Sequence, residues 1–232
     1  MQLTLQQVAR LFHVSENTVT QWIQEENLPV HEIRSCYRFD RAELLEWAVA
    51  TRRSFSPEIF QETNGDHVAE VSLAEAIERG GVARCTEGND RCSVFRDAIG
   101  RLPFPETFDR DNLLELLMAR EKLGGTAVGN GIAIPHPRYP IVLPGSESVV
   151  QVCFLKEPID FRAGDGVPVD TLFLMICPTV HVHLQLLARL ACVLQSETFR
   201  GQLRSRPDKA QLVAAVRKAE ESFAASQKME QS

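Results

Sequence analysis

The stretch that decides the fold is Arg120–Arg138, which reads REKLGGTAVGNGIAIPHPR. An amphipathic helix is predicted to end at Leu123, because glycines follow it and glycine is a poor helix former. A glycine-rich loop comes next, and the short apolar strand Ile132–Ile134 then leads into Pro135-His136. The stretch therefore predicts a helix, a glycine-rich loop and a strand in direct succession, with a histidine at the end of the strand.

The same stretch suits phosphate chemistry. Glycines allow a backbone to approach a ligand closely and to turn its amides inward, so such a loop suits anionic oxygens. Pro135 and Pro137 fix the backbone around His136, and we expect an accessible ring there. A neutral imidazole is a competent nucleophile toward phosphorus near neutral pH. On spacing alone, a glycine-rich connection with an incidental histidine remains an open interpretation.

Helix-like and strand-like segments alternate from Val68 onward. The segments 148–155 and 171–177 are almost continuously apolar, which is typical of strands covered on both faces. This alternation predicts an α/β domain whose sheet is flanked by helices. The expected helices cover residues 73–79, 94–102, 110–123, 184–194 and 208–220, and a flexible tail is expected at 223–232.

The first fifty residues predict a small, mainly helical unit. Thr4 followed by Gln7 is a capping-box pattern, and Ser15 is placed to cap a second helix. Residues 30–39 alternate in polarity and predict a short hairpin, after which Asp40 caps a third helix. The polar stretch 51–67 predicts a linker, so we expect one domain at 1–50 and another at 68–222.

Composition and charge narrow the class of protein. No apolar run in the 232 residues approaches the roughly 18–20 that cross a bilayer, and no secretory signal is visible, so a cytoplasmic location is expected. The six cysteines contain no C-x-x-C and predict neither a disulfide framework nor a metal site. Residues 1–53 hold 6 of the 25 basic and 7 of the 31 acidic residues, so neither domain is basic. This balance weighs against nucleic-acid binding by bulk electrostatics.

The stretch ending at His136 resembles the signature of the phosphotransferase-system enzyme IIA domains of the fructose/mannitol type, most closely the nitrogen-regulatory subgroup. Matching residues begin with Arg120-Glu121 and end with the strand that leads into His136, and the resemblance covers roughly residues 70–220. A downstream PVDTLFLMICP segment followed by His183-Leu184 matches the last core strand and a second histidine of the family. The resemblance implies the enzyme IIA type 2 fold, with a central mixed sheet flanked by helices.

The resemblance also implies roles for individual residues. His136 corresponds to the phosphoacceptor, and His183 to the histidine that donates a hydrogen bond to the phosphoryl group or orients the ring; His181 is the weaker candidate. Arg120 corresponds to an arginine whose guanidinium can pair with phosphoryl oxygens. Where the family commonly has glycine after the acceptor, this chain has Pro137, which removes one backbone donor. The residues expected to contact phosphate from the loop are Thr126, Gly129, Asn130 and Gly131.

The first fifty residues resemble the excisionase/MerR-like winged helix-turn-helix family through LTLQQVARLFHVSENTVTQWIQEENLPV and the later YRFDRAELLEW. The resemblance implies a small core of Val8, Ala9, Val14, Val19 and Ile23. It also implies that the second helix is the recognition helix and that the hairpin supplies a phosphate contact. Thr20, Gln21 and Gln24 take the places of the basic residues common in that helix, and glutamates lie alongside them. Docking of a protein or dimerisation is therefore an alternative to DNA binding. The implied DNA-contacting residues are Ser15, Asn17, Thr18, Thr20, Gln21 and Arg38.

These resemblances predict a regulatory phosphocarrier that takes a phosphoryl group on His136 from an HPr-like phosphohistidine carrier. Its attached helix-turn-helix unit is expected to act on DNA or on regulated target proteins. No cofactor, ATP site or membrane contact is implied, and the chain is not expected to be a turnover enzyme in the usual sense. Two alternatives remain open: a sugar-transport enzyme IIA that passes phosphate to a IIB domain, and a transcription factor with an unphosphorylated IIA-like sensor.

Overall fold

A computed structural model of the chain describes residues 2–33, 36–51, 53, 71–145 and 147–230. The chain divides into two compact units, residues 1–69 and 70–232. Most of the linker expected at 51–67 lies outside the described residues, while Thr51 still belongs to a helix. No helix in the described part of the chain is long and apolar enough to cross a membrane.

The first unit combines three helices with a small antiparallel sheet in the order β1-β3-β2. The predicted caps are confirmed: Thr4 and Gln7 form a capping box, and the Ser15 hydroxyl accepts a hydrogen bond from the backbone amide of Thr18 at 3.1 Å. The predicted hairpin is confirmed as well. The elements are β1 (Gln2–Leu3), α1 (Leu5–Leu11), α2 (Glu16–Glu25), β2 (His31–Ile33), β3 (Cys36–Asp40) and α3 (Arg41–Thr51).

Aromatic rings fill the centre of this unit. The ring centroids of Phe12 and Trp22 lie 5.6 Å apart, and those of Trp22 and Trp47 lie 5.3 Å apart. Arg53 covers the cluster, with its guanidinium carbon 4.1 Å from the Trp22 ring centroid. Val8, Ala9 and Val19 are buried as predicted, whereas Val14 and Ile23 are only half-buried. The expected aliphatic core was therefore incomplete, because the larger rings take its central positions.

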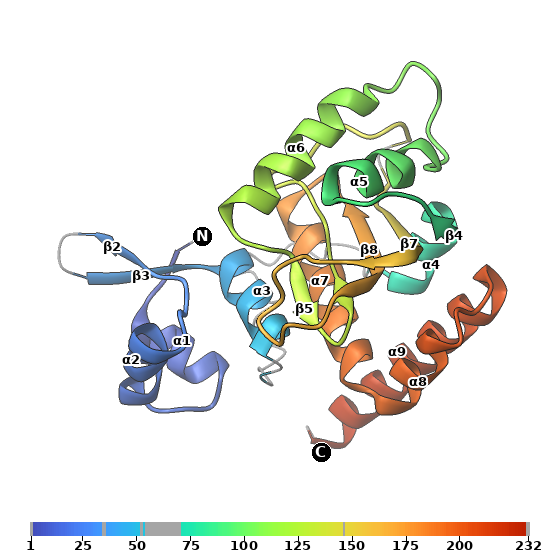
Figure 1. The fold of residues 1–232 in the computed structure, drawn as a ribbon. Helices are drawn as coiled ribbons and strands as arrows, with labels where there is room; N and C mark the ends of the chain where they lie inside the picture. Colours follow the sequence, from blue (N-terminus) through green and yellow to red (C-terminus); the bar gives the residue numbers. More distant parts are fainter. Residues whose placement is uncertain (1, 34–35, 52, 54–70, 146, 231–232) are drawn as a thin grey trace. The chain divides into compact units, whose positions relative to one another are not determined.

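The second unit is built on a five-stranded mixed sheet with the order β4-β7-β8-β6-β5 (Figure 1). Strands β4 and β7 are parallel, β7 and β8 antiparallel, β8 and β6 parallel, and β6 and β5 antiparallel. The central pair is apolar on both faces, as the sequence predicted. The strands are β4 (Val82–Thr86), β5 (Ala127–Gly129), β6 (Ile132–Ala133), β7 (Val149–Ile159) and β8 (Val169–Ile176).

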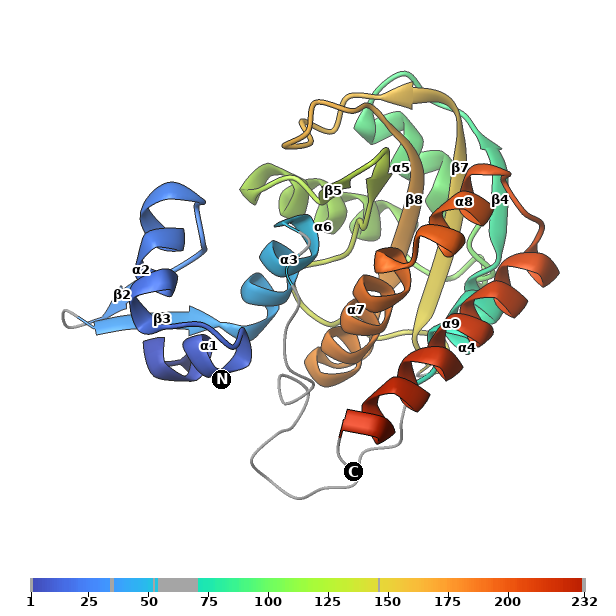
Figure 2. The same ribbon diagram turned by 90° about the horizontal axis from the view of Figure 1, so that it is seen from below.

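Helices cover both faces of the sheet, which explains why its central strands carry apolar residues on either side. Helices α5 and α6 lie on one face, and α7, α8 and α9 lie on the other (Figure 2). Phe95, Leu113 and Leu117 of the first pair pack with Leu172 and Leu174 of β8 in one buried cluster. The helices are α4 (Leu73–Gly80), α5 (Arg91–Gly100), α6 (Arg110–Leu123), α7 (Val180–Gln195), α8 (Glu197–Arg204) and α9 (Lys209–Glu230).

Several elements differ from expectation. Strand β4 was not predicted, and β5 was read as loop because glycine flanks it on both sides. Helix α8 was not predicted either, although Ser196 caps it through the backbone amide of Phe199. The backbone of α9 remains helical to Glu230, so the tail expected at 223–232 is helical over most of its length. That segment contains no glycine or proline to end the helix.

Candidate functional site

His136 follows the end of β6 and is fixed by backbone hydrogen bonds on both sides. The Ile134 amide donates to the Thr126 carbonyl at 2.9 Å, and the Met175 amide donates to the Pro135 carbonyl at the same distance. These bonds tie the segment to β5 on one side and to β8 on the other. The flanking prolines fix the backbone on either side of the ring.

The orientation of the His136 ring determines which nitrogen is nucleophilic. Nδ1 lies 2.7 Å from the carbonyl oxygen of Ile134. A carbonyl oxygen can only accept a hydrogen bond, so in the neutral ring Nδ1 carries the proton. The lone pair that can bond to phosphorus is then on Nε2.

His183 lies directly beside His136. It sits in the first turn of α7, which Thr179 caps through the amide of Val182, and the centroids of the two imidazoles are 4.7 Å apart. His181 is occupied elsewhere, because its Nε2 lies 2.8 Å from the side-chain amide nitrogen of Gln185. Of the two histidines considered in this segment, the structure brings His183 to the phosphoacceptor candidate.

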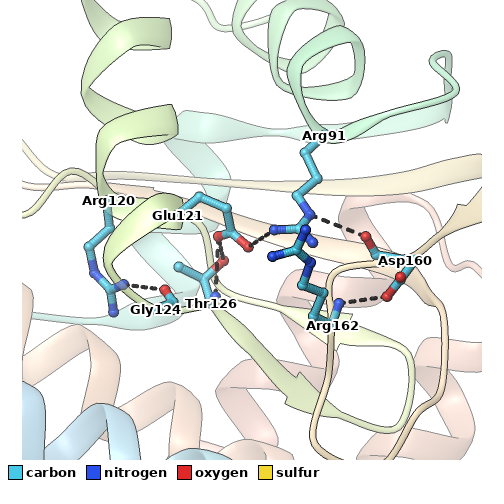
Figure 3. A network of polar contacts seen from close by, with 7 residues as sticks. All are labelled: Arg91, Arg120, Glu121, Gly124, Thr126, Asp160 and Arg162. Carbon is cyan, nitrogen blue, oxygen red and sulfur yellow. Dashed lines mark hydrogen bonds and ion pairs between the residues drawn. The ribbon is translucent and has the colours of Figure 1, made fainter.

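Arg120 lies in the last turn of α6 and is half-buried. Its Nη1 donates to the carbonyl oxygen of Gly124 at 2.6 Å, closing the end of the helix (Figure 3). The guanidinium therefore supports the turn that leads into β5. That strand pairs with β6, and His136 follows β6.

Glu121 is a buried acidic residue that the sequence reasoning did not single out as functional. Its side chain is 2% exposed, and it accepts hydrogen bonds from the amide and hydroxyl of Thr126, at 3.2 and 2.7 Å, and from Arg91 at 3.2 Å (Figure 3). Arg91 also donates to the Asp160 carbonyl at 3.1 Å. The network joins α5, α6 and β5. Thr126, expected to contact phosphate, directs its hydroxyl to Glu121 instead.

The glycine segment expected to cradle phosphate lies at the other end of the strand. Gly129, Asn130 and Gly131 form the turn between β5 and β6, with positive φ angles of 82°, 54° and 77°. The Asn130 amide donates to the Asp165 carboxylate at 2.7 Å. Because this turn precedes β6 and His136 follows it, the structure does not bring the three residues to the ring. Their positive φ angles serve the hairpin turn.

The proline after the phosphoacceptor candidate is buried, whereas Arg138 is exposed. The Arg138 guanidinium carbon lies 5.7 Å from the centroid of the Tyr139 ring. Pro137 provides no backbone N–H, so the amide donor common in relatives is absent from this position.

Five of the six candidate DNA-contacting residues of the first unit lie on or beside α2, and Arg38 lies in β3. Thr20 donates to the Glu16 carbonyl at 3.0 Å, and the Gln21 amide donates to Glu25 at 2.8 Å. Arg38, in the hairpin, donates to the neighbouring Tyr37 carbonyl at 3.0 Å. The remaining candidates are Ser15 and Thr18, whose hydroxyls lie 2.8 Å apart, and the exposed Asn17.

Two known families match the two units. Residues 77–219 match the family described as phosphoenolpyruvate-dependent sugar phosphotransferase system, EIIA 2. Residues 3–50 match a helix-turn-helix domain family. The second match covers α1, α2, the hairpin and nearly all of α3.

Individual relatives agree with the match to the EIIA family. The chain is 47% identical over 103 residues to a nitrogen regulatory protein of Pseudomonas aeruginosa, covering 43% of this chain and 64% of that protein. It is 38% identical over 97 residues to a fructose-specific EIIA component of Haloferax volcanii, covering 41% of this chain and 61% of that protein. The crystal structure of nitrogen regulatory protein IIA-Ntr from Neisseria meningitidis aligns with a TM-score of 0.55 at 27% identity, covering 62% of this chain and 98% of that one.

Proposed function

Because the chain belongs to the phosphoenolpyruvate-dependent sugar phosphotransferase system EIIA 2 family, with a helix-turn-helix domain at its start, we propose that it is a regulatory phosphocarrier. His136 accepts a phosphoryl group from a phosphohistidine on an HPr-like carrier protein. The observation that supports this most directly is the bond from Nδ1 to the Ile134 carbonyl, which leaves the nucleophilic lone pair on Nε2. The 47% identity to a nitrogen regulatory protein favours regulation over sugar transport.

In the proposed reaction, Nε2 of His136 attacks phosphorus while the bond between phosphorus and the donor's imidazole nitrogen breaks in line with it. The positive charge that develops on the His136 ring is stabilised by the Ile134 carbonyl at Nδ1. His183, with its ring centroid 4.7 Å away, and Arg120 donate hydrogen bonds to the phosphoryl oxygens.

A protein donor is supported by exposed apolar side chains that lie close in sequence to candidate site residues. Leu123, Tyr139 and Val180 are exposed by 65%, 69% and 52%. Each lies three residues from a candidate site residue: Leu123 from Arg120, Tyr139 from His136 and Val180 from His183. These side chains would offer a protein donor apolar groups to contact.

Transfer is tested by incubating the full chain with enzyme I, an HPr-like carrier and phosphoenolpyruvate. The proposal predicts one phosphoryl group per chain, labile in acid and stable in base, that is lost in His136→Ala. His181→Ala serves as the matched control, because that ring contacts Gln185 and should leave labelling unchanged. Labelling that persists in His136→Ala, or no labelling with any competent carrier, contradicts the proposal.

The helix-turn-helix unit is proposed to bind DNA or a partner protein in a way that depends on phosphorylation. Phosphorylation adds about −1.5 to −2 charges at a defined position, enough to change how the protein binds DNA or a partner protein. We expect DNA binding of the full chain to differ between the phosphorylated protein and His136→Ala in a gel-shift assay with genomic fragments. Identical DNA and partner binding in both states contradicts the regulatory link. Transfer from His136 to a sugar-specific IIB partner would favour the transport role of the Haloferax relative instead.

A further inference from the structure

A polar cavity lies at the opposite end of β6 from His136. Its volume is about 170 Å³. The floor comes from the starts of the parallel strands β6 and β8, where Ile132 pairs with Thr171, and one wall comes from α8. It is smaller than the pockets of roughly 300–1,000 Å³ that hold drug-sized molecules. The cavity therefore suits a small ligand.

Three arginines line this cavity: Arg200, Arg204 and Arg206. Arg200 is held in place by its bonds to the carbonyl oxygens of Leu194 and Gln195, at 2.7 and 3.2 Å. Across the described part of the chain, no side chain forms an ion pair or hydrogen bond with the guanidinium of Arg204 or Arg206. Arg204 and Arg206 therefore carry N–H donors that no side chain of the described residues uses. Both line the cavity together with a third cation, Arg200.

The backbone of this wall is fixed. Arg206 adopts a positive φ of 52°, and its carbonyl oxygen accepts a hydrogen bond from Arg84 of β4 at 2.6 Å. Its amide donates to the Leu203 carbonyl at 2.9 Å. The position of Arg204 can be explained without a ligand, because its positive charge compensates the partial negative charge at the C-terminal end of α8. That explanation does not extend to Arg206, which lies beyond the helix in a conformation unfavourable for arginine.

The part of the lining that comes from β8 and from the hairpin turn carries acceptors. Asp170 lines the cavity, and its carboxylate accepts the Thr171 hydroxyl at 2.7 Å. Asn130 adds an exposed side-chain amide from the hairpin turn. The arginines of the cavity thus favour an anion, and the Asp170 carboxylate favours a group that donates hydrogen bonds. A phosphate monoester of a short polyol has both kinds of group.

From this arrangement we propose that the cavity binds a small phosphate monoester that carries hydroxyl groups. Arg204 and Arg206 hold the phosphate, because a guanidinium pairs with phosphate oxygens through two parallel hydrogen bonds. Asp170 and Asn130 bind the hydroxyl groups. The inference is independent of the proposed phosphoryl transfer, because none of these residues belongs to the site at His136.

The test is an NMR titration of the full-length protein with glycerol 3-phosphate and, separately, with inorganic phosphate at constant ionic strength. Both probes should shift the backbone signals of Asn130 and Thr171, and glycerol 3-phosphate should bind more tightly because its hydroxyls reach Asp170. The double variant R204Q/R206Q should weaken both affinities at least about tenfold. Arg96→Gln, an exposed arginine of α5, is the matched control and should leave both unchanged.

Two further measurements distinguish ligand binding in the cavity from phosphoryl transfer at His136. His136→Ala should bind both probes as the natural protein does, and R204Q/R206Q should keep its circular dichroism spectrum and its phosphorylation at His136. Failure of glycerol 3-phosphate to bind, or equal binding by R204Q/R206Q, overturns the proposal. A double variant that loses affinity for duplex DNA while its titration with glycerol 3-phosphate is unchanged also overturns it, and assigns the arginines to nucleic acid.

Discussion

Replacing Arg91 with methionine should destabilise the larger unit, because it leaves the Glu121 carboxylate charged and buried without its cationic partner. The two side chains lie 3.2 Å apart, and Glu121 is 2% exposed while Arg91 is 20% exposed. After the change, the amide and hydroxyl of Thr126 are the hydrogen-bond donors that remain to the carboxylate among the described residues. Methionine keeps much of the apolar stem of the arginine.

The expected loss can be estimated from the burial of the pair. Removing one partner of a fully buried ion pair costs about 3–5 kcal/mol. Because Arg91 is partly solvated, we expect about 3 kcal/mol, the lower end of that range. The double variant R91M/E121Q should lose about 1–2 kcal/mol less than R91M alone, because glutamine keeps an acceptor for Thr126 and carries no charge.

The assay is urea unfolding of the full chain followed by far-UV circular dichroism. Trp22 and Trp47 are the two tryptophans of the chain and lie in the first unit, so fluorescence reports that unit separately. Arg101→Met is the control, since its pair with Asp97 is 43% and 29% exposed and should contribute no more than about 1 kcal/mol. A loss below 1 kcal/mol in R91M, or a double variant less stable than R91M, refutes the reasoning.

Three other outcomes are expected. Ser15→Ala removes a helix cap and should lower the stability of the first unit by about 1 kcal/mol in fluorescence-monitored unfolding; no change refutes the capping role. Gly131→Ala should lower the free energy of unfolding by about 1 kcal/mol or more, because φ is +77° and the added carbon would lie 3.3 Å from Asp170; an unchanged melting temperature contradicts this. Burial raises the pKa of Cys153 and of Cys177 to about 12, so both thiols stay protonated at pH 8. Iodoacetamide should leave both unmodified until urea is added, and labelling of the native protein refutes this.

Local signals explain which elements were predictable. Helix α6 begins and ends at the residues expected, because Asp109 caps it and Gly124 follows it. Strands β7 and β8 were recognisable from their apolar runs. Strand β4 has the mixed sequence VARCT, and only its pairing with the buried β7 makes it a strand.

The sequence predicted that His136 and His183 lie side by side, and it predicted the rest of the candidate site's geometry only in part. The histidines were recognisable from the motif and from their order along the chain. The glycines were misplaced, because the sequence gives the same signal for a hairpin turn with positive φ as for a phosphate-binding loop. Glu121 was overlooked, since a glutamate in a helix is usually solvated and its burial depends on Arg91, thirty residues earlier.

The central claim is that Nε2 of His136 accepts the phosphoryl group. It is tested most directly by ¹H–¹⁵N NMR of the protein labelled on its histidine rings, before and after phosphorylation by an HPr-like carrier. The account predicts phosphorus on Nε2 of His136, with Nδ1 still protonated and donating to the Ile134 carbonyl. A spectrum with phosphorus on Nδ1, or with the ring unchanged after exposure to a competent phosphorylated carrier, contradicts it.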